Sequence, residues 1–302
     1  MRDKPTISVV VFVRNAADTI ERALMSVTSP DQPPIELLVI DGGSTDGTVD
    51  VIRRFEDKIA FWRSHIDNGA AYALNEGVRR ATGDIISLLP ADDWIEPGAL
   101  HAVRDAFSQD PSLEVLSCGT RFAHIAIDGS VIVDAEFCDF DVLELNMQNL
   151  VRCPLTAGRF ILRRIYEEFN AYDTTYTIGS DLDFLIKVYL KKPHAKIHPN
   201  LVYTYRKHSG STTLGGNPRM ILAAMRDNIA ISRHYFFASG VSNVDQRELL
   251  GLHGRSCARY AWMTLVRGQM AESLRAIIGA IKLSPRWPID VIVWSAQKWL
   301  IR

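Results

Sequence analysis

Several features that would assign a protein chain quickly are absent from this sequence. The formal net charge is −1, so the sequence lacks the basic excess that nucleic-acid-binding proteins carry. It has only four cysteines, none of which lies in a CxxC pair or has a histidine at zinc-finger spacing. We therefore expect reduced thiols in a cytosolic protein, with no structural zinc and no nucleic-acid partner.

Long apolar runs and two familiar nucleotide-binding motifs are missing as well. No stretch approaches the roughly 20 apolar residues of a membrane-spanning helix, and residues 1–13 lack the basic start and cleavage site of a signal peptide. These absences predict a cytoplasmic protein that at most lies on the inner face of the plasma membrane. The absence of GxGxxG and GxxxxGK(S/T) argues against a dinucleotide-binding Rossmann domain and a P-loop ATPase.

Strand and helix patterns alternate over the first 90 residues, which predicts an α/β fold with a doubly wound, mostly parallel sheet. In such sheets ligands bind outside the carboxyl ends of the strands, so the loops at Arg14, Asp41 and Asp92 are the candidate binding loops. The expected strands are residues 7–13, 35–40, 59–62 and 84–89, and the expected helices are residues 16–27, 48–55 and 70–81.

The pattern changes after residue 113 and again near residues 215–218, where Gly-Gly-Asn-Pro is typical of a linker. We therefore expect an α/β domain over residues 1–215 and a helical region over residues 216–302. The Asp128-Gly129 pair fits a hairpin turn. Further expected strands are 113–118, 121–127, 131–133, 158–162 and 195–205, and further expected helices are 181–190, 219–237, 247–267, 270–283 and a last segment after Pro285.

Two adjacent carboxylates, Asp92 and Asp93, directly follow the fourth buried strand. Such a pair can divide its work, one acid holding Mg²⁺ or Mn²⁺ and the other accepting hydrogen bonds from a sugar hydroxyl. The alternative is a solvated acidic turn before a helix that starts near Glu96-Pro97. The pair by itself leaves both interpretations open.

The loop from Asp41 to Gly47 follows the second buried strand. Gly42 and Gly43 let the backbone approach a ligand closely. Ser44 or Asp46 can cap the helix that follows, and a capped turn between strand and helix would alone explain these residues.

Together these segments resemble the ordered landmarks of glycosyltransferase family 2, over roughly residues 6 to 213. The landmarks are VVFVRN (10–15), ELLVIDGGSTDGT (36–48), DNG (67–69), ALNEG (73–77), ATGD (81–84), ADDW (91–94), GSDLDF (179–184) and YRKHSGSTT (205–213). The resemblance implies a GT-A fold, a Rossmann-like doubly wound sheet, with a C-terminal helical extension. It also implies an inverting glycosyltransferase of the kind that builds bacterial polysaccharides.

The resemblance carries roles over to individual positions. It implies that Asp93 coordinates a Mn²⁺ or Mg²⁺ ion bridging the donor's two phosphates, with His208 as a second metal or phosphate contact. Asp92 would bind the ribose or the donor sugar. Asp181 stands at the position of the general base that deprotonates the acceptor hydroxyl, and Asp183 is its rival for that role.

The resemblance also implies a nucleotide-sugar site, and two departures from the family pattern affect it. Gly42 replaces a second acid that often contacts the base, and Arg14 replaces an aromatic residue. Base recognition then rests on Asp41, on the backbone or on Asp67, and UDP is the expected nucleotide ahead of GDP and dTDP. The residues expected at this site are Arg14, Asn15, Asp41, Gly43, Asp67, Asn75 and Asp92.

The partners implied are a nucleotide sugar and a saccharide or lipid-linked acceptor. The apolar helices after residue 216 predict packing on the catalytic domain or on a second subunit, or contact with a membrane surface. A nucleotidylyltransferase would carry a Gly-rich basic loop after the first strand, which here reads Val13-Arg-Asn-Ala-Ala-Asp18. A non-catalytic sugar-nucleotide-binding protein would have lost Asp93 or Asp181, and both are present.

Overall fold

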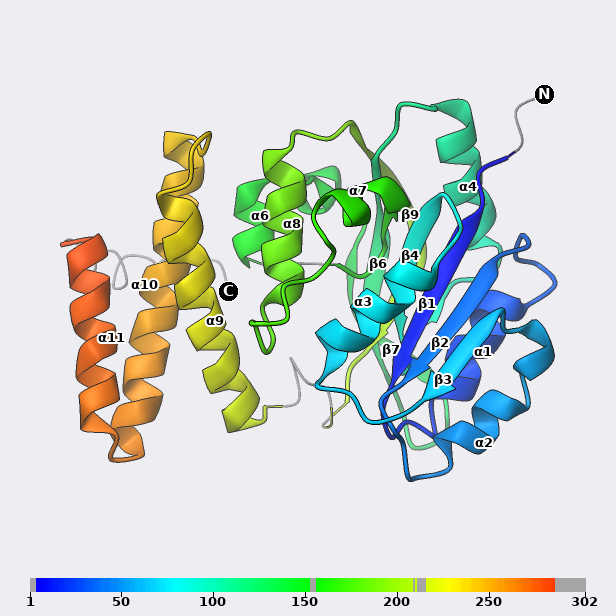
Figure 1. Cartoon of the computed structure of the whole chain (residues 1–302), viewed down its shortest axis with the longest axis horizontal. Helices are drawn as coiled ribbons and strands as arrows, with labels where there is room; N and C mark the ends of the chain where they lie inside the picture. Colours follow the sequence, from blue (N-terminus) through cyan, green and yellow to red (C-terminus); the bar gives the residue numbers. More distant parts are fainter. Residues whose placement is uncertain (1–3, 153–155, 209, 211–215, 286–302) are drawn as a thin grey trace. The chain divides into compact units, whose positions relative to one another are not determined.

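The structure is a computed structural model, and it describes residues 4–152, 156–208, 210 and 216–285 (Figure 1). The chain divides into two compact units. Unit 1 comprises Met1–Leu145, Leu155–Thr174 and Lys187–His208, and unit 2 comprises Asn146–Pro154, Thr175–Ile186 and Ser209–Arg302. Unit 2 therefore includes two short segments from before residue 216. The domain boundary expected at residue 215 stays a prediction.

Four parallel strands form the first half of the sheet in unit 1, in the spatial order β3-β2-β1-β4. The apolar residues of β1, β2 and β4 are mostly buried, as the apolar runs of the sequence predict, whereas the edge strand β3 is only partly buried. The strands are β1 (Ile7–Val13), β2 (Glu36–Asp41), β3 (Phe61–Ser64) and β4 (Ile85–Pro90), joined by α1 (Ile20–Thr28), α2 (Thr48–Arg53), the 3₁₀ turn η1 (Glu56–Lys58) and α3 (Ala70–Arg80).

The second half of the sheet mixes strand directions. Strand β8 (Arg159–Leu162) runs antiparallel to both β4 and β6 (Val115–Ile125), and β9 (Ala195–Arg206) runs parallel to β6. Short β5 (Trp94–Ile95) pairs with β9, and β7 (Val131–Phe137) pairs with β6. The mostly parallel α/β sheet is confirmed. The other helices of this unit are α4 (Ala99–Gln109), α5 (Phe140–Leu143) and α7 (Arg163–Glu168).

One strand prediction was wrong, because the two strands expected at 113–118 and 121–127 are replaced by the single strand β6, Val115–Ile125. The register against β9 shifts around Gly119 instead of breaking. A Cβ at residue 119 would lie 2.6 Å from the Asn200 carbonyl oxygen, so only glycine allows this close approach. The irregularity that suggested two strands is thus a bulge within one strand.

Unit 2 consists of helices: α6 (Met147–Arg152), the start of α8 (Ser180–Leu190), α9 (Pro218–Phe236), α10 (Asn243–Val266) and α11 (Met270–Leu283). Helix α10 contacts α6, α9 and α11. The Asn217 side chain caps α9 and Ser242 caps α10, so α10 begins four residues earlier than predicted. The segment expected after Pro285 lies outside the described residues. Within those residues, no helix has both the length and the apolar character needed to cross a membrane.

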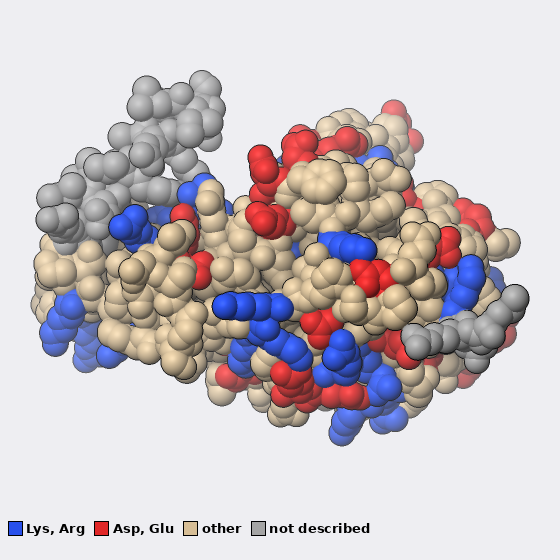
Figure 2. All heavy atoms as spheres, turned by 90° about the horizontal axis from the view of Figure 1, so that it is seen from above, with Lys and Arg blue, Asp and Glu red and all other residues tan. Residues whose placement is uncertain are grey.

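The parallel strands end in register at one edge of the sheet. Val13 lies opposite Asp41, Asp41 lies opposite Ser64, and Pro90 lies opposite Phe12. The loops that follow β3, β2, β1 and β4 are therefore neighbours in that order. Elsewhere on the molecule, Lys and Arg side chains lie among Asp and Glu on the face shown in Figure 2, in keeping with the net charge of −1.

Candidate active site

Asp41 organises the loop after β2. The residue is fully buried, and its Oδ2 accepts hydrogen bonds from the backbone N–H groups of Gly43, at 3.2 Å, and Ser44, at 3.0 Å. The hydroxyls of Ser44 and Ser64 also donate to this carboxylate. Both of its oxygens therefore accept hydrogen bonds from the surrounding loops. The buried Asp41 side chain thus holds these loops in place at the edge of the sheet.

The two glycines of this loop differ, because only the position of Gly43 requires glycine. Gly43 has φ = +78°, and a Cβ there would lie 2.9 Å from the backbone nitrogen of Ile66. A Cβ on Gly42 would lie 3.4 Å from Asp67 Oδ1 and 3.5 Å from the Arg14 side chain. Gly42 thus leaves open the space between Arg14 and Asp67.

Asn15 joins the loop after β1 to the loop after β2. It adopts the left-handed conformation at φ = +53°, which asparagine tolerates better than most residues. Its Oδ1 accepts a hydrogen bond from Thr45 N–H at 2.9 Å, and its own N–H donates to Ser44 Oγ at 2.7 Å. The neighbouring Arg14 side chain is exposed. This junction therefore presents Arg14 at the edge of the sheet.

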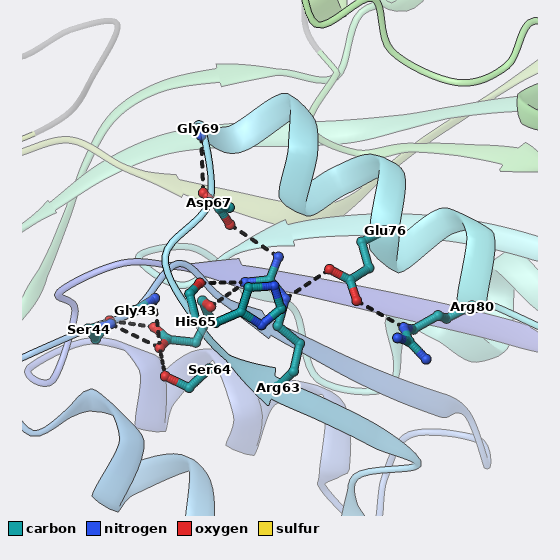
Figure 3. A network of polar contacts seen from close by, with 10 residues as sticks. Gly43, Ser44, Arg63, Ser64, His65, Asp67, Gly69, Glu76 and Arg80 are labelled. Atoms are coloured by element: carbon teal, nitrogen blue, oxygen red, sulfur yellow. Dashed lines mark hydrogen bonds and ion pairs between the residues drawn. The ribbon is translucent and has the colours of Figure 1, made fainter.

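Arg63, at the carboxyl end of β3, is a central residue of the site that the sequence analysis missed. Figure 3 shows its guanidinium between Asp67 and Glu76, at 3.2 Å and 2.9 Å. It also donates to the carbonyl oxygens of Asp41 and His65. Its place at the end of a parallel strand was the signal that could have identified it.

The acid partners of Arg63 are held in place by further contacts. Asp67 Oδ1 accepts from Gly69 N–H at 3.0 Å, and Glu76 binds Arg80 at 3.0 Å. Burial acts to raise the pKa of Glu76, but hydrogen bonds from Arg80 and Arg63 outweigh it and lower that pKa. Glu76 is therefore ionised at neutral pH and keeps Arg63 oriented.

Asn75, which was expected at the nucleotide site, binds backbone in this structure. Its amide nitrogen donates to the Tyr172 carbonyl oxygen, and its amide oxygen accepts from Tyr172 N–H, both at 2.8 Å. The side chain thus ties α3 to the segment after α7. A role for Asn75 at the nucleotide stays a prediction.

Asp92 and His208 form a pair at the ends of β4 and β9. Asp92 Oδ2 lies 2.8 Å from His208 Nε2, and the two side chains are 28% and 31% exposed. A carboxylate oxygen and an imidazole nitrogen are both ligands that Mn²⁺ accepts in proteins. Within the described residues, no group of three or more His, Cys, Asp or Glu side chains is arranged to hold a metal.

Asp93 lies deeper than its neighbour. It is only 1% exposed, its Oδ2 accepts from the Tyr203 hydroxyl at 2.6 Å, and its Oδ1 accepts from Arg206 N–H at 2.8 Å. Burial, and after it the charge of Asp92, raises the pKa of Asp93 well above its usual range. Asp93 thus fastens β9 to the loop after β4, while Asp92 and His208 face solvent.

Asp181 and Asp183 lie on the first turn of α8, in unit 2. Asp183 is buried, and its Oδ1 accepts from the Tyr235 hydroxyl at 2.8 Å. Asp181 is half-buried, and burial raises its pKa to about 6 although Leu182 N–H donates to its Oδ1. The two rival carboxylates therefore have different surroundings, and Asp181 is the more accessible one.

Comparison with known proteins identifies the family. The sequence model described as glycosyl transferase family 2 matches residues 8–169, more than half of the chain. The chain belongs to glycosyl transferase family 2. The matched residues include the loops after β1, β2, β3 and β4, and the expected family is confirmed.

Curated proteins match part of this chain. The poly-β-1,6-N-acetyl-D-glucosamine synthase of Staphylococcus epidermidis is 30% identical over 117 residues, which cover 38% of this chain and 28% of that protein. The glycosyltransferase AglE of Haloferax volcanii is 34% identical over 104 residues, or 31% of this chain and 34% of that protein. The chain thus spans about a third or less of the length of these curated relatives.

Solved structures of other proteins share the fold. S. aureus TarS 1–349 in complex with UDP-GlcNAc has a TM-score of 0.59 at 15% identity, covering 94% of this chain and 91% of that chain. The mannosyltransferase PcManGT of Pyrobaculum calidifontis, in complex with GDP-Man and Mn²⁺, has a TM-score of 0.60 at 17% identity, covering 100% of this chain and 82% of that chain. The expected GT-A fold is confirmed.

Proposed function

We propose that this family 2 member is an inverting, metal-assisted glycosyltransferase. It would move a sugar from a nucleotide diphosphate, with a UDP-sugar the favoured donor, to a hydroxyl of a saccharide or lipid-linked acceptor. The observation that carries the proposal is the carboxyl edge of the sheet in unit 1. There Asp92 follows β4 and lies against His208, which follows β9, and β4 lies beside β1, whose carboxyl end leads into the Arg14 loop.

The nucleoside would lie over the loops after β1, β2 and β3. Gly42 leaves space between Arg14 and Asp67, a cation that can stack on a base and a carboxylate that can accept from a base or ribose. Asp41 and Asn15 would hold these loops in position through their hydrogen bonds and would not need to touch the nucleoside. Two strand spacings, roughly 10 Å, separate β2 from β4, so a ligand extended across β1 would reach Asp92.

The diphosphate would lie at Asp92 and His208, which fit a divalent cation. Their ligand atoms are 2.8 Å apart and partly exposed, and the donor phosphates would complete the coordination. When bound, the cation would offset the negative charge that develops on the departing diphosphate. Asp93, expected as the main ligand, already accepts from Tyr203 and Arg206, so we assign the outward ligand role to Asp92 and His208.

Asp181 would act as the general base. Its ionised carboxylate would take the proton of the acceptor hydroxyl as that oxygen attacks the anomeric carbon from the face opposite the diphosphate, which inverts the configuration. A pKa of about 6 leaves the group ionised at neutral pH and more basic than an ordinary aspartate. Asp183 is engaged by Tyr235 and so is the weaker candidate.

We propose a role in surface polysaccharide biosynthesis on the cytoplasmic side of the membrane, and the name of one relative supports the polysaccharide part of this proposal. That relative is named as a poly-N-acetyl-D-glucosamine synthase. The helical unit presents exposed apolar side chains, among them Trp262, Met270 and Leu274, which are 67%, 70% and 57% exposed. We propose that these residues contact a second copy of the chain or the membrane surface that carries the acceptor.

A binding screen followed by a turnover assay tests the function. UDP-GlcNAc, other UDP-sugars and GDP-mannose are added to the full chain with and without Mn²⁺, and thermal unfolding is measured. At about 100 times Kd a true donor stabilises by about 2.7 kcal/mol, and we expect this only with the cation. Release of nucleotide on addition of acceptor separates an enzyme from a binding protein. Protection by no nucleotide sugar, or equal protection without metal, would contradict the proposal.

A further inference from the structure

Helix α9 makes two hydrogen-bonded contacts with the segment around Asp181. Asp227 makes the first of them. This carboxylate is only 5% exposed, and its Oδ2 accepts hydrogen bonds from two successive backbone N–H groups, Ile178 at 2.7 Å and Gly179 at 3.1 Å. These groups immediately precede the first residue of α8, at a helix start where backbone N–H groups have no acceptor within the helix. Asp227 therefore fixes where α8 begins.

The second contact lies two turns further along the same face of α9. Tyr235 is eight residues after Asp227, a spacing that returns to the same side of a helix. It is 4% exposed, and its hydroxyl donates to Asp183 Oδ1 at 2.8 Å. The two contacts hold α8 on either side of Asp181, at residues 178–179 and at residue 183.

Gly179 lets the start of α8 approach α9 closely. A Cβ on residue 179 would lie 2.7 Å from Ile231 Cδ1 and 3.0 Å from Asp227 Cβ. Ile231 is fully buried and lies midway between Asp227 and Tyr235 in the sequence. Any side chain at residue 179 would therefore push the α8 start away from α9.

The packing of two helices does not by itself require a buried carboxylate that accepts from the backbone at the start of the neighbouring helix. A buried carboxylate that accepts from two backbone donors forms charge-assisted hydrogen bonds, which are directional and stronger than neutral ones. A general base must lie within hydrogen-bond reach of the proton that it removes, and a displacement of 1 Å can lower a rate about 100-fold. The contacts from α9 lie on either side of Asp181, the carboxylate that we propose as the base.

We propose that Asp227 and Tyr235 are positioning residues that hold Asp181 in the orientation needed to deprotonate the acceptor. The inference rests on the proposed role of Asp181 as the base. It goes further in assigning part of the catalytic geometry to the C-terminal helices. Asp227 and Tyr235 touch neither donor nor acceptor in this account, and they act only through the start of α8.

The test is a double-mutant cycle in the full-length protein. The variants are Tyr235→Phe, Asp227→Asn and Asp181→Asn, together with the two pairs that include Asp181→Asn. Tyr260→Phe is the matched control, because its hydroxyl makes a similar 2.9 Å hydrogen bond to Glu272 between α10 and α11. The rate measured is nucleotide release from UDP-GlcNAc and from GDP-mannose with Mn²⁺, with water or a sugar mixture as acceptor, across roughly pH 5 to 9.

If the positioning role is correct, Tyr235→Phe and Asp227→Asn each lower kcat about tenfold and leave the donor KM unchanged. They also shift the acid limb of the pH profile, whereas Tyr260→Phe changes neither. In the Asp181→Asn background the same substitutions cause no further loss, because the group that they position is gone. Hydrogen exchange at residues 178–185 speeds up in Tyr235→Phe and not in Tyr260→Phe.

Two outcomes would overturn the inference. One is an equal loss of kcat in the presence and absence of the Asp181 carboxylate, which shows general destabilisation. The other is normal turnover and exchange in Tyr235→Phe and Asp227→Asn while Asp181→Asn is inactive. Full turnover in Asp181→Asn would disprove the assignment of Asp181 as the base. Hydrogen exchange at residues 178–185 would then still show whether Tyr235 holds the start of α8.

Discussion

The carboxylate of Asp92 and the imidazole of His208 lie 2.8 Å apart although 116 residues separate them in the sequence. Asp92 follows β4, and His208 follows β9, whose last residues pair with β5 just after Asp92 and Asp93. Asp93 fixes this junction through Tyr203 and Arg206 N–H. The two acids thus differ in their surroundings, because Asp93 joins β9 to the loop after β4 while Asp92 is partly exposed to solvent.

Removing either solvent-facing group should weaken metal binding. We expect Asp92→Asn and His208→Asn each to weaken Mn²⁺-dependent UDP binding by at least about tenfold, because each removes a proposed ligand. Asp93→Asn should mainly lower the unfolding temperature, because an amide has one acceptor oxygen and cannot accept from both the Tyr203 hydroxyl and Arg206 N–H. Titration calorimetry with UDP at several Mn²⁺ concentrations measures the effect.

The matched control is Asp50→Asn, on the exposed surface of α2. An Asp93→Asn protein that unfolds normally but no longer binds Mn²⁺ would return the ligand role to Asp93.

The elevated pKa of Asp181 predicts a pH-dependent rate. The base works only when ionised, so turnover should rise as pH increases through about 6 and level off above it. The same shift predicts an effect on stability. A folded-state pKa above the ordinary 3.8 means that the folded protein loses stability as pH rises from about 4 to 6.

Asp181→Asn should therefore raise the unfolding temperature at pH 7 while it lowers turnover by orders of magnitude. Calorimetric melting at pH 5 and pH 7 gives the first quantity, and nucleotide release gives the second. A variant with near-normal turnover would remove Asp181 from the mechanism, and a lower melting temperature at pH 7 would contradict the burial argument.

Arg63 should control the nucleotide loops. Arg63→Lys keeps the charge but cannot reach Asp67, Glu76 and the loop carbonyls together, because an ammonium lacks the planar fork of the guanidinium. We expect UDP affinity to fall about tenfold and stability to fall by about 1–3 kcal/mol. Fluorescence binding and urea unfolding measure the two effects.

Arg53→Lys, at a largely exposed ion pair with Asp50, is the control and should change neither quantity. Normal UDP binding by the Arg63→Lys protein would show that the network supports the fold alone.

The exposed apolar residues of α11 should mediate association. We expect Met270→Glu combined with Leu274→Glu to reduce either dimer formation in sedimentation velocity or binding to anionic liposomes. Ile127→Glu, at the exposed hairpin of unit 1, is the control. If the double variant sediments and binds liposomes like the unchanged protein, Met270 and Leu274 mediate neither kind of association.

The sequence predicts the elements of this fold better than the behaviour of its polar side chains. The strands before Arg14 and Asp41 are clear because buried strands need continuous apolar runs, and the loops follow from their ends. Asp93 has partners more than 100 residues away, and Asn75 binds Tyr172, so no local pattern distinguishes structural polar groups from binding groups.

Arg63 was missed for a related reason. It stands in the short strand β3 with no motif around it, and its role depends on contacts with Asp67 and Glu76 on a following loop and helix. The α9 contacts to residues 178–183 were also beyond sequence reasoning, because Asp227 lies in a helix that showed only apolar periodicity.

The most direct test is a crystal structure of the full chain grown with UDP and Mn²⁺, with the cation located by its anomalous scattering. The account predicts one Mn²⁺ in contact with Asp92, His208 and the diphosphate, and the uridine over the loops that carry Arg14 and Asp67. A cation or nucleotide bound away from the carboxyl ends of β1, β2 and β4 would contradict it.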